Sequence, residues 1–281
     1  MRRCQPALGT YVEITASLLG PASDEPPSSA PELVSSSIYA SVPAAITAAF
    51  EAIATVEACM SVFKPDSDVS RINAGVFRGR PGAIHPWLWD VLALAKEVHA
   101  LSEAFDPCAG QALVRQGLRP AMGDFPTTGR LDDLRLLEDH QVVTTAPLYL
   151  DLGGIAKGAA VDRAVEALLA LGMTSGCVNA GGDLRVFGPS TQAIHVRRPT
   201  APHTSVYVGD LQDGALATSG DYVAPHLIDP ARQTPLCTQQ SFSVLAPRCA
   251  VADALTKVYA VTGDAHHPAL RHFGAQALEA L

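Results

Sequence analysis

The sequence lacks clustered positive charge, metal-type cysteine pairs and long apolar runs. Its formal net charge of −8 is spread along the chain, and no block of Lys and Arg could neutralise a phosphate backbone, which argues against a nucleic-acid partner. No stretch of about 18 uncharged apolar residues occurs, so no membrane span is expected. The first ten residues lack the apolar run of a signal peptide, and the chain as given is therefore expected to be cytoplasmic.

The six cysteines are scattered, without a CxxC pair or a Cys/His cluster at zinc spacing. Cys59 and Cys177 have apolar neighbours, where Cys behaves as a small hydrophobic residue, and we expect reduced thiols throughout. The 281 residues are 48% hydrophobic and 17% charged, which suits a soluble protein with a sizeable core. We expect a single domain over 1–281, built as one unit or as two closely packed subdomains.

The first half of the chain predicts few regular elements. Residues 9–19 carry β-branched side chains and predict a strand, and residues 21–37, rich in Pro and Ser, predict a mobile surface loop. Apolar residues at helical spacing predict helices over 44–60 and 87–102. Residues 111–137 show little pattern and are expected to cover the surface.

The second half is richer in strands. Short strands are expected at 142–145 and 148–150, before a helix that opens within 151–158 and runs to about residue 171. Further strands are predicted over 176–178, 183–186, 193–196, 205–208, 215–218 and 241–245. A last helix is expected over 251–262. Because helices and strands mix without strict alternation, the pattern favours an α+β fold.

Residues 151–158 combine a carboxylate, adjacent glycines and a lysine at the start of a helix. Glycines let a ligand approach the backbone, while helix N–H groups and Lys157 can hold phosphate. Asp151 can accept a hydrogen bond from a ligand. An ordinary strand-to-helix turn explains the segment equally well.

Two later loops have a similar character. Residues 179–183 place consecutive glycines between two strands, as a ligand loop or a plain hairpin turn would. Residues 217–230 gather hydroxyls, His226 and two carboxylates, either as a functional loop or as a solvated one.

The last helix carries a polar face. Asp253, Thr256 and Lys257 stand at i, i+3 and i+4 and therefore share one side of the helix. A carboxylate and a hydroxyl on adjacent turns suit Mg²⁺, which substrate phosphates and water would complete. The alternative is a surface Asp–Lys pair contributing at most about 0.5 kcal/mol.

Eight segments, taken in order, resemble the FAD:protein FMN transferases of the ApbE type. They are residues 8–10, 60–73, 105–107, 151–158, 179–183, 218–222, 226–230 and 252–255. The resemblance implies an α+β fold of two packed subdomains with the flavin nucleotide in the groove between them. It also implies an enzyme that uses Mg²⁺ and FAD, attaches FMN by a phosphoester bond to Thr or Ser of an acceptor flavoprotein, and releases AMP. Alternatives are an FAD-binding protein without transferase activity and an FAD pyrophosphatase giving FMN and AMP.

The resemblance also implies roles for individual residues. FAD contacts are expected from Leu8, Phe63, Ala104, Phe105, Asp106, Asp151, Lys157 and Ser219. Metal ligands are expected from the Gly154 carbonyl and from the helix of Asp253, Thr256 and Lys257. Asp253 is also expected to be needed for catalysis, and His226 or Asp229 is expected to take the acceptor's proton.

Three residues and one segment depart from the family pattern. Leu8 replaces the usual Met, Phe63 replaces the usual Tyr, and the segment between Tyr222 and His226 is short. The most consequential change is Lys257, where the family usually has Thr, because an ammonium cannot ligate Mg²⁺. Two outcomes follow: Thr256 becomes the hydroxyl ligand while Lys257 contacts a phosphate, or Lys257 supplies part of the metal's charge.

Overall fold

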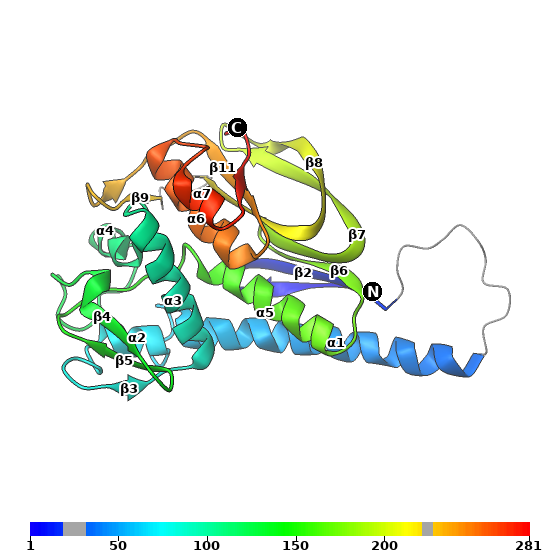
Figure 1. Cartoon of the computed structure of the whole chain (residues 1–281), viewed down its shortest axis with the longest axis horizontal. Coiled ribbons are helices and arrows are strands. Elements are labelled where there is room, and N and C mark those ends of the chain that lie inside the picture. The colour runs from blue at the N-terminus through cyan, green and yellow to red at the C-terminus, as the bar shows by residue number, and fades with distance from the viewer. Residues whose placement is uncertain (19–31, 221–226) are drawn as a thin grey trace.

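A seven-stranded antiparallel sheet forms the larger part of the protein (Figure 1). The structure is a computed structural model, and it describes residues 1–18, 32–220 and 227–281. In spatial order the strands are β1 (Arg2–Ala7), β2 (Thr10–Ser17), β6 (Ser175–Ala180), β7 (Asp183–Arg198), β8 (Ala201–Gly220), β11 (Ser241–Ala246) and β12 (Gln276–Ala277).

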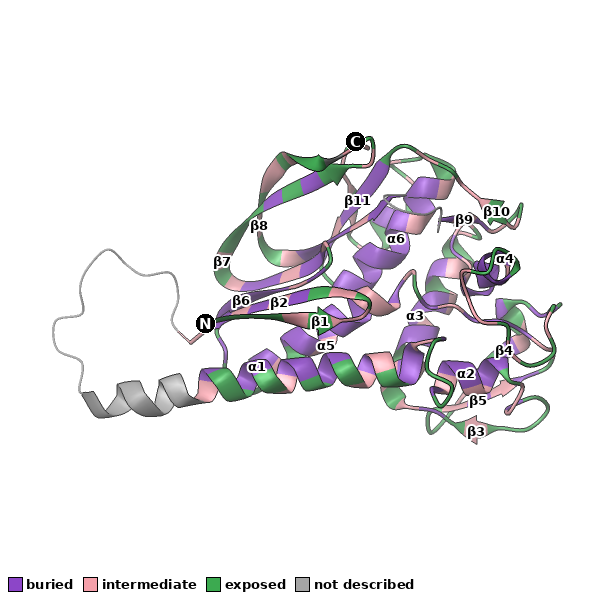
Figure 2. Cartoon of the chain, turned by 180° about the vertical axis from the view of Figure 1, so that it is seen from behind, coloured by how far each residue is buried: buried purple, intermediate pink, exposed green. Residues whose placement is uncertain are grey.

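Three helices pack against this sheet: α1 (Glu32–Met60), α5 (Ala156–Ala170) and α6 (Cys249–Thr262). Helix α5 lies between the other two and contacts β6 and β7, while α6 contacts β8 and β11. Figure 2 shows α6 buried almost throughout, which fits its run of small apolar residues. The main hydrophobic core therefore lies between the sheet and these helices.

A smaller part lies beside the large sheet (Figure 1). Its three strands are β3 (Gly82–Ala83), β5 (Gln141–Thr144) and β4 (Leu134–Leu137), in that spatial order. Its helices are α2 (Asp68–Asn73), α3 (Pro86–Leu101), α4 (Gln111–Arg115) and the short 3₁₀ turns η1 (Pro107–Gly110) and η2 (Leu131–Asp133). The remaining elements are β9 (Ile228–Asp229), β10 (Thr234–Pro235) and α7 (Pro268–His272).

The predicted helix ends agree closely with the structure where sequence signals are strong. Helix α3 begins at Pro86, and the His85 ring accepts a hydrogen bond of 3.1 Å from the Trp87 N–H. Helix α6 ends at Thr262, and the next residue, Gly263, caps it with a φ of 68° that suits a glycine. The α+β class is confirmed.

Helix α1 begins at Glu32 rather than at residue 44, so the loop prediction for 21–37 is wrong for its last six residues. The rest of that segment up to residue 31 lies outside the described residues. Pro43 stands inside the helix, although a Pro normally marks a helix start. Once a helix has formed, each further residue adds one backbone hydrogen bond at little entropic cost. Composition alone therefore does not reveal how far the helix extends.

Other differences arise from contacts between segments distant in sequence. Residues 148–150 form no strand, because the Leu150 N–H and carbonyl bond to the Asn73 side chain at 2.7 and 2.9 Å. Strand β1 is not predicted, because its sequence lacks alternation. Residues 111–137 do more than cover the surface, since Leu113, Leu131 and Leu134 are buried.

Several predicted short strands join into the two long strands β7 and β8. Register shifts interrupt their pairing, for example between Val186 and Thr191. Such irregularities break the alternation of side chains without ending the ladder. The second, smaller apolar cluster lies on these strands, with Val186, Ile194 and Leu216 among its members.

One helical segment of the described chain, Ser41–Met60, is long and apolar enough to cross a membrane by length and composition. Half of its most apolar window is buried within the fold. The expectation of no span rests on a stricter criterion, a stretch without any charge. The compartment stays a prediction.

Candidate functional site

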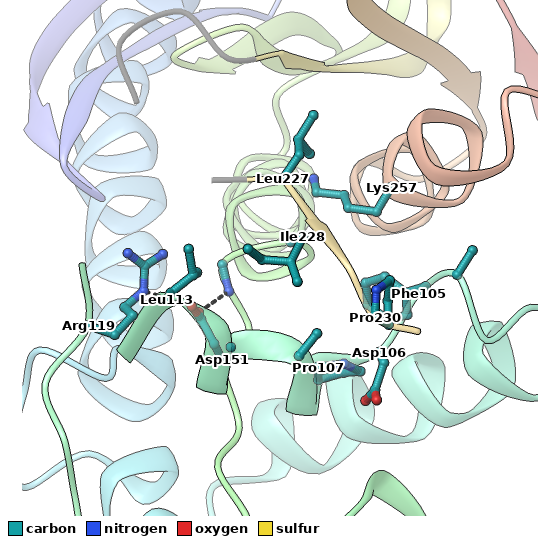
Figure 3. Close-up of a pocket in the computed structure, with 15 residues that line it drawn as sticks. Phe105, Asp106, Pro107, Leu113, Arg119, Asp151, Leu227, Ile228, Pro230 and Lys257 are labelled. Atoms are coloured by element: carbon teal, nitrogen blue, oxygen red, sulfur yellow. Dashed lines mark hydrogen bonds and ion pairs between the residues drawn. The ribbon is translucent and has the colours of Figure 1, made fainter. Parts of the chain in front are cut away.

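A cleft of about 100 Å³ brings together several of the predicted site residues (Figure 3). Its lining includes Ala104, Phe105, Asp106, Asp151, Gly154 and Lys257. These residues come from the loop before η1, the turn into α5, and α6. In Figure 3, Lys257 reaches in from α6, whereas Asp151 and Arg119 lie together on the other side.

Two glycines allow α5 and α6 to approach each other at the cleft. A Cβ on Gly158 would lie 2.3 Å from the Cys249 carbonyl oxygen, so only glycine permits this contact between backbones. A Cβ on Gly154 would lie 3.2 Å from Lys257 Cε. The Lys257 side chain therefore lies directly over the Gly154 backbone.

Each of these helices has its N-terminus capped by a carboxylate of the other. Asp253 of α6 accepts a 3.1 Å hydrogen bond from the Gly158 N–H, in the first turn of α5. Asp162 of α5 accepts two bonds of 2.9 Å from the Cys249 and Ala250 N–H groups of α6. Neither helix is capped by the side chain of its own N-cap residue. Reciprocal capping thus fixes the two N-termini together.

Asp253 belongs to a compact group of four charges. The Lys257 ammonium pairs with its carboxylate and donates a second bond of 2.9 Å to its backbone carbonyl. Lys157 pairs with Asp183, at the start of β7. The carboxylates are almost inaccessible, with side-chain exposures of 1% and 2%, whereas Lys257 and Lys157 are 19% and 35% exposed. We call this group the lysine–aspartate cluster.

The four charges influence one another. Burial raises the pKa of Asp253, but Lys257 and Lys157 outweigh it and leave this pKa below its usual value. Asp183 behaves differently, because burial, reinforced by the nearby Asp253 charge, holds its pKa above the usual value. Although burial opposes it, the carboxylates of Asp183 and Asp253 raise the pKa of Lys157. Lys157 is therefore firmly a cation.

Two predicted hydroxyl groups, those of Ser219 and Thr256, do not line the cleft. Ser219 and Thr256 share a 2.7 Å hydrogen bond, and both are buried. The Thr256 hydroxyl also donates a 2.7 Å bond to the Asp253 carbonyl. Their hydrogen bonds connect β8 to α6.

Arg119, which the sequence did not single out, connects two predicted flavin residues. Its Nε donates a 2.7 Å bond to Asp151, and its guanidinium lies 5.3 Å from the centre of the Phe63 ring. Phe63 is 65% exposed and lies against Arg119, which lines the cleft, so an accessible aromatic ring stands at the cleft rim. Asp151 also accepts a 2.8 Å bond from the Gly153 N–H. Arg119 stands in a segment without pattern, and no sequence signal marked it.

Other candidates hold turns. Asp106 accepts a 2.8 Å bond from the Cys108 N–H. Asp229 accepts bonds from the Ala231 and Arg232 N–H groups and from the Arg232 guanidinium. Burial would raise the pKa of Asp229, but the bonds from Arg232 and Ala231 lower it overall. His226 lies outside the described residues.

Leu8 occupies the turn between β1 and β2, away from the cleft lining. Its φ of 55° is unusual for a residue with a side chain, and Gly9 follows with 71°. The next residue, Thr10, contacts the glycine turn at Gly181, where a Cβ would lie 2.6 Å from the Thr10 hydroxyl oxygen. The first and fifth segments of the family pattern are therefore neighbours.

The predicted magnesium ligands do not suit Mg²⁺ in this arrangement. One Asp253 oxygen pairs with Lys257 and the other accepts from Gly158, while Thr256 is bonded to Ser219 and to the Asp253 carbonyl. Lys257 also covers Gly154. Within residues 1–18, 32–220 and 227–281, no group of three or more His, Cys, Asp or Glu side chains gathers as a candidate metal site. The Lys257 ammonium therefore occupies the Asp253 carboxylate, and the Lys257 side chain lies against Gly154.

Comparisons with known proteins agree on one family. An FAD:protein FMN transferase of Vibrio cholerae serotype O1 is 29% identical over 232 residues, 73% of this chain and 69% of that protein. The Haemophilus influenzae FAD:protein FMN transferase is 29% identical over 74% of this chain and 70% of its own length. The apo crystal structure of Pseudomonas stutzeri flavinyl transferase ApbE superposes with a TM-score of 0.76 at 22% identity, covering 99% and 89% of the two chains. A model of the ApbE family matches residues 8–281, and the chain belongs to that family.

Proposed function

We propose that the protein is an FAD:protein FMN transferase, which attaches FMN to a Thr or Ser hydroxyl of an acceptor flavoprotein. The relatives named above carry that activity in their names. The observation that carries the proposal is the lysine–aspartate cluster at the N-terminus of α5, beside a cleft with an exposed aromatic ring at its rim. FAD has a diphosphate between two aromatic ring systems, so its binding site needs positive charge for the diphosphate and an aromatic surface for a ring.

The proposed reaction transfers the FMN phosphoryl group from the AMP half of FAD to the acceptor hydroxyl. The acceptor hydroxyl oxygen attacks the phosphorus of the FMN half, and the bond from that phosphorus to the bridging oxygen breaks. AMP leaves with the bridging oxygen, and the hydroxyl proton passes to a base. Charge builds on the phosphate oxygens, so fixed cations beside them lower the barrier.

The cleft suggests how the residues divide this work. Lys257 and Lys157 supply positive charge, and the N-terminus of α5 adds the positive end of its helix dipole. Phe63 and Arg119 offer a flat surface for a ring. Asp229 is committed to its turn and has a lowered pKa, so His226 is the proposed proton acceptor.

The sequence predicted that Mg²⁺ takes part, with two possible roles for Lys257. The contacts of Lys257 favour the second role, in which its ammonium supplies charge that a metal would otherwise bring. The acceptor is proposed to be a protein whose Ser or Thr is exposed enough to enter the cleft.

The test is incubation with FAD and candidate acceptor domains, with the acceptor mass and released AMP measured together. We expect an acceptor heavier by one FMN and an equal amount of AMP. Asp253→Asn keeps the size of the side chain but removes the charge that holds Lys257, and we expect activity to fall by about tenfold to a hundredfold. Asp162→Asn makes the same change at the other helix N-terminus, away from the cleft, and should leave the activity per folded molecule unchanged.

Two other results would support the alternatives. Release of AMP with unmodified acceptors would indicate an FAD pyrophosphatase. Bound FAD with neither release of AMP nor a modified acceptor would indicate a flavin-binding protein and would contradict the proposed transfer.

A further inference from the structure

Lys257 has the position and contacts of a bound cation. Its ammonium pairs with the Asp253 carboxylate and donates to the Asp253 carbonyl, and its Cε would lie 3.2 Å from a Cβ on Gly154. Of these groups, the Asp253 carboxylate and Gly154 are expected from the sequence to ligate Mg²⁺. The two contacts use two of the three donors of an ammonium, which leaves one for an anion in the cleft.

The surrounding charges also balance without a metal ion. Asp183 and Asp253 contribute two negative charges, and Lys157 and Lys257 contribute two positive ones. A divalent ion beside Asp253 would meet two ammonium groups and share one carboxylate oxygen with Lys257. Hard divalent ions need several free oxygen ligands, whereas both carboxylate oxygens of Asp253 and the Thr256 hydroxyl already have partners.

We infer that the Lys257 ammonium is a built-in cation for a diphosphate in the cleft, so that FAD binds without a divalent metal ion. The inference rests on the proposed function, because it takes FAD as the ligand. Asp253 acts here as a positioning residue, since it holds the ammonium over Gly154 and joins it to the first turn of α5.

The first experiment uses the unchanged protein. FAD affinity is measured by fluorescence anisotropy in Mg²⁺ and in excess EDTA, and binding of Mn²⁺ is followed by electron paramagnetic resonance with and without FAD. We expect the two affinities to agree within about threefold, a difference of less than about 1 kcal/mol, and Mn²⁺ to stay free. FAD binding that requires Mg²⁺, or Mn²⁺ immobilised at one site per chain, would overturn the inference and leave the transferase proposal standing.

The second experiment removes the ammonium in two ways. Lys257→Ala removes the charge and opens space beside Asp253, whereas Lys257→Met removes the charge but keeps most of the volume. Losing a charged hydrogen bond should weaken FAD binding in EDTA by about tenfold to a hundredfold in both variants. Mg²⁺ should restore binding in the Ala variant, where it can reach the free carboxylate, and should not do so in the Met variant.

The outcomes separate the inference from the proposed function. No binding of FAD under any condition overturns the proposed function and this inference with it. Unchanged FAD affinity in folded Lys257→Met overturns the inference alone. If both variants fail to fold, as judged by circular dichroism, the affinities and the Mn²⁺ spectra of the unchanged protein still decide.

Discussion

Helices α5 and α6 begin side by side, and a carboxylate from the other helix caps each N-terminus. Asp162 completes this arrangement for α6 and also binds Arg185 at 2.9 Å. Asp253 completes it for α5 and binds Lys257 at the cleft. The local geometry is similar, yet burial raises the pKa of Asp162, whereas two lysines lower that of Asp253.

The comparison shows that a carboxylate can cap a neighbouring helix in the same way whether it serves packing alone or also a functional site. At α6 the carboxylate serves packing, and its cation lies away from the cleft lining. At α5 the same kind of carboxylate holds an ammonium over a backbone glycine. The chemistry therefore depends on which cation the carboxylate meets, and substitutions at the two caps test that division.

The largest expected effect is on stability, at the packing site. Asp162→Ala leaves the buried Cys249 and Ala250 N–H groups without an acceptor and Arg185 without its partner. We expect the free energy of unfolding to fall by about 3 to 5 kcal/mol, measured by urea denaturation. The FAD affinity of the folded fraction should stay unchanged. A loss below about 1 kcal/mol would mean that these N–H groups reach water, and the cap would be unimportant.

The second expected effect tests how closely the two N-termini must approach. Gly158→Ala places a Cβ 2.3 Å from the Cys249 carbonyl, where neither backbone can move alone. We expect a loss of about 2 to 3 kcal/mol, which exceeds the helix propensity that alanine gains. Gly154→Ala is the matched control, because the tightest contact of its Cβ is with the flexible Lys257 chain, at 3.2 Å, and the Phe105 ring lies at an ordinary 3.6 Å. Equal losses in the two variants, by thermal or urea unfolding, would contradict the idea of a tight contact at Gly158.

The same contrast explains what the sequence could predict. Asp253, Thr256 and Lys257 share a face because helix geometry is local, and the structure confirms it. The sequence does not reveal Asp183 as the partner of Lys157, because the two are 26 residues apart and only the fold joins them. The hydrogen bond from the Cys249 N–H to Asp162 joins residues 87 apart in the sequence, so no short sequence pattern predicts it.

The sequence likewise does not reveal how deeply the Asp253–Lys257 pair is buried. From sequence, Asp253 and Lys257 could be a surface pair of little consequence or part of a metal site. The pair forms, but the carboxylate is inaccessible, because α6 packs against both the sheet and α5. Spacing along a helix predicts which side chains pair, whereas the burial of the pair depends on the packing of the whole fold.

The smallest expected effect is a pH dependence of opposite sign at the two caps. The folded pKa of Asp162 is raised, so between the unfolded value of about 3.9 and that higher pKa the folded state binds more protons. The stability that this residue contributes is therefore fully present below about pH 3.9 and is lost as pH rises through the folded pKa.

Urea unfolding of the unchanged protein and of Asp162→Asn across this range isolates the effect. The stability difference in favour of the unchanged protein should shrink as pH rises. For Asp253→Asn the sign reverses, because the lowered pKa of Asp253 makes its contribution present above about 3.9 and lost as pH falls through the folded value. Parallel curves for the two variants would mean that their carboxylates meet equivalent charges, and the contrast between the packing cap and the cleft cap would fail.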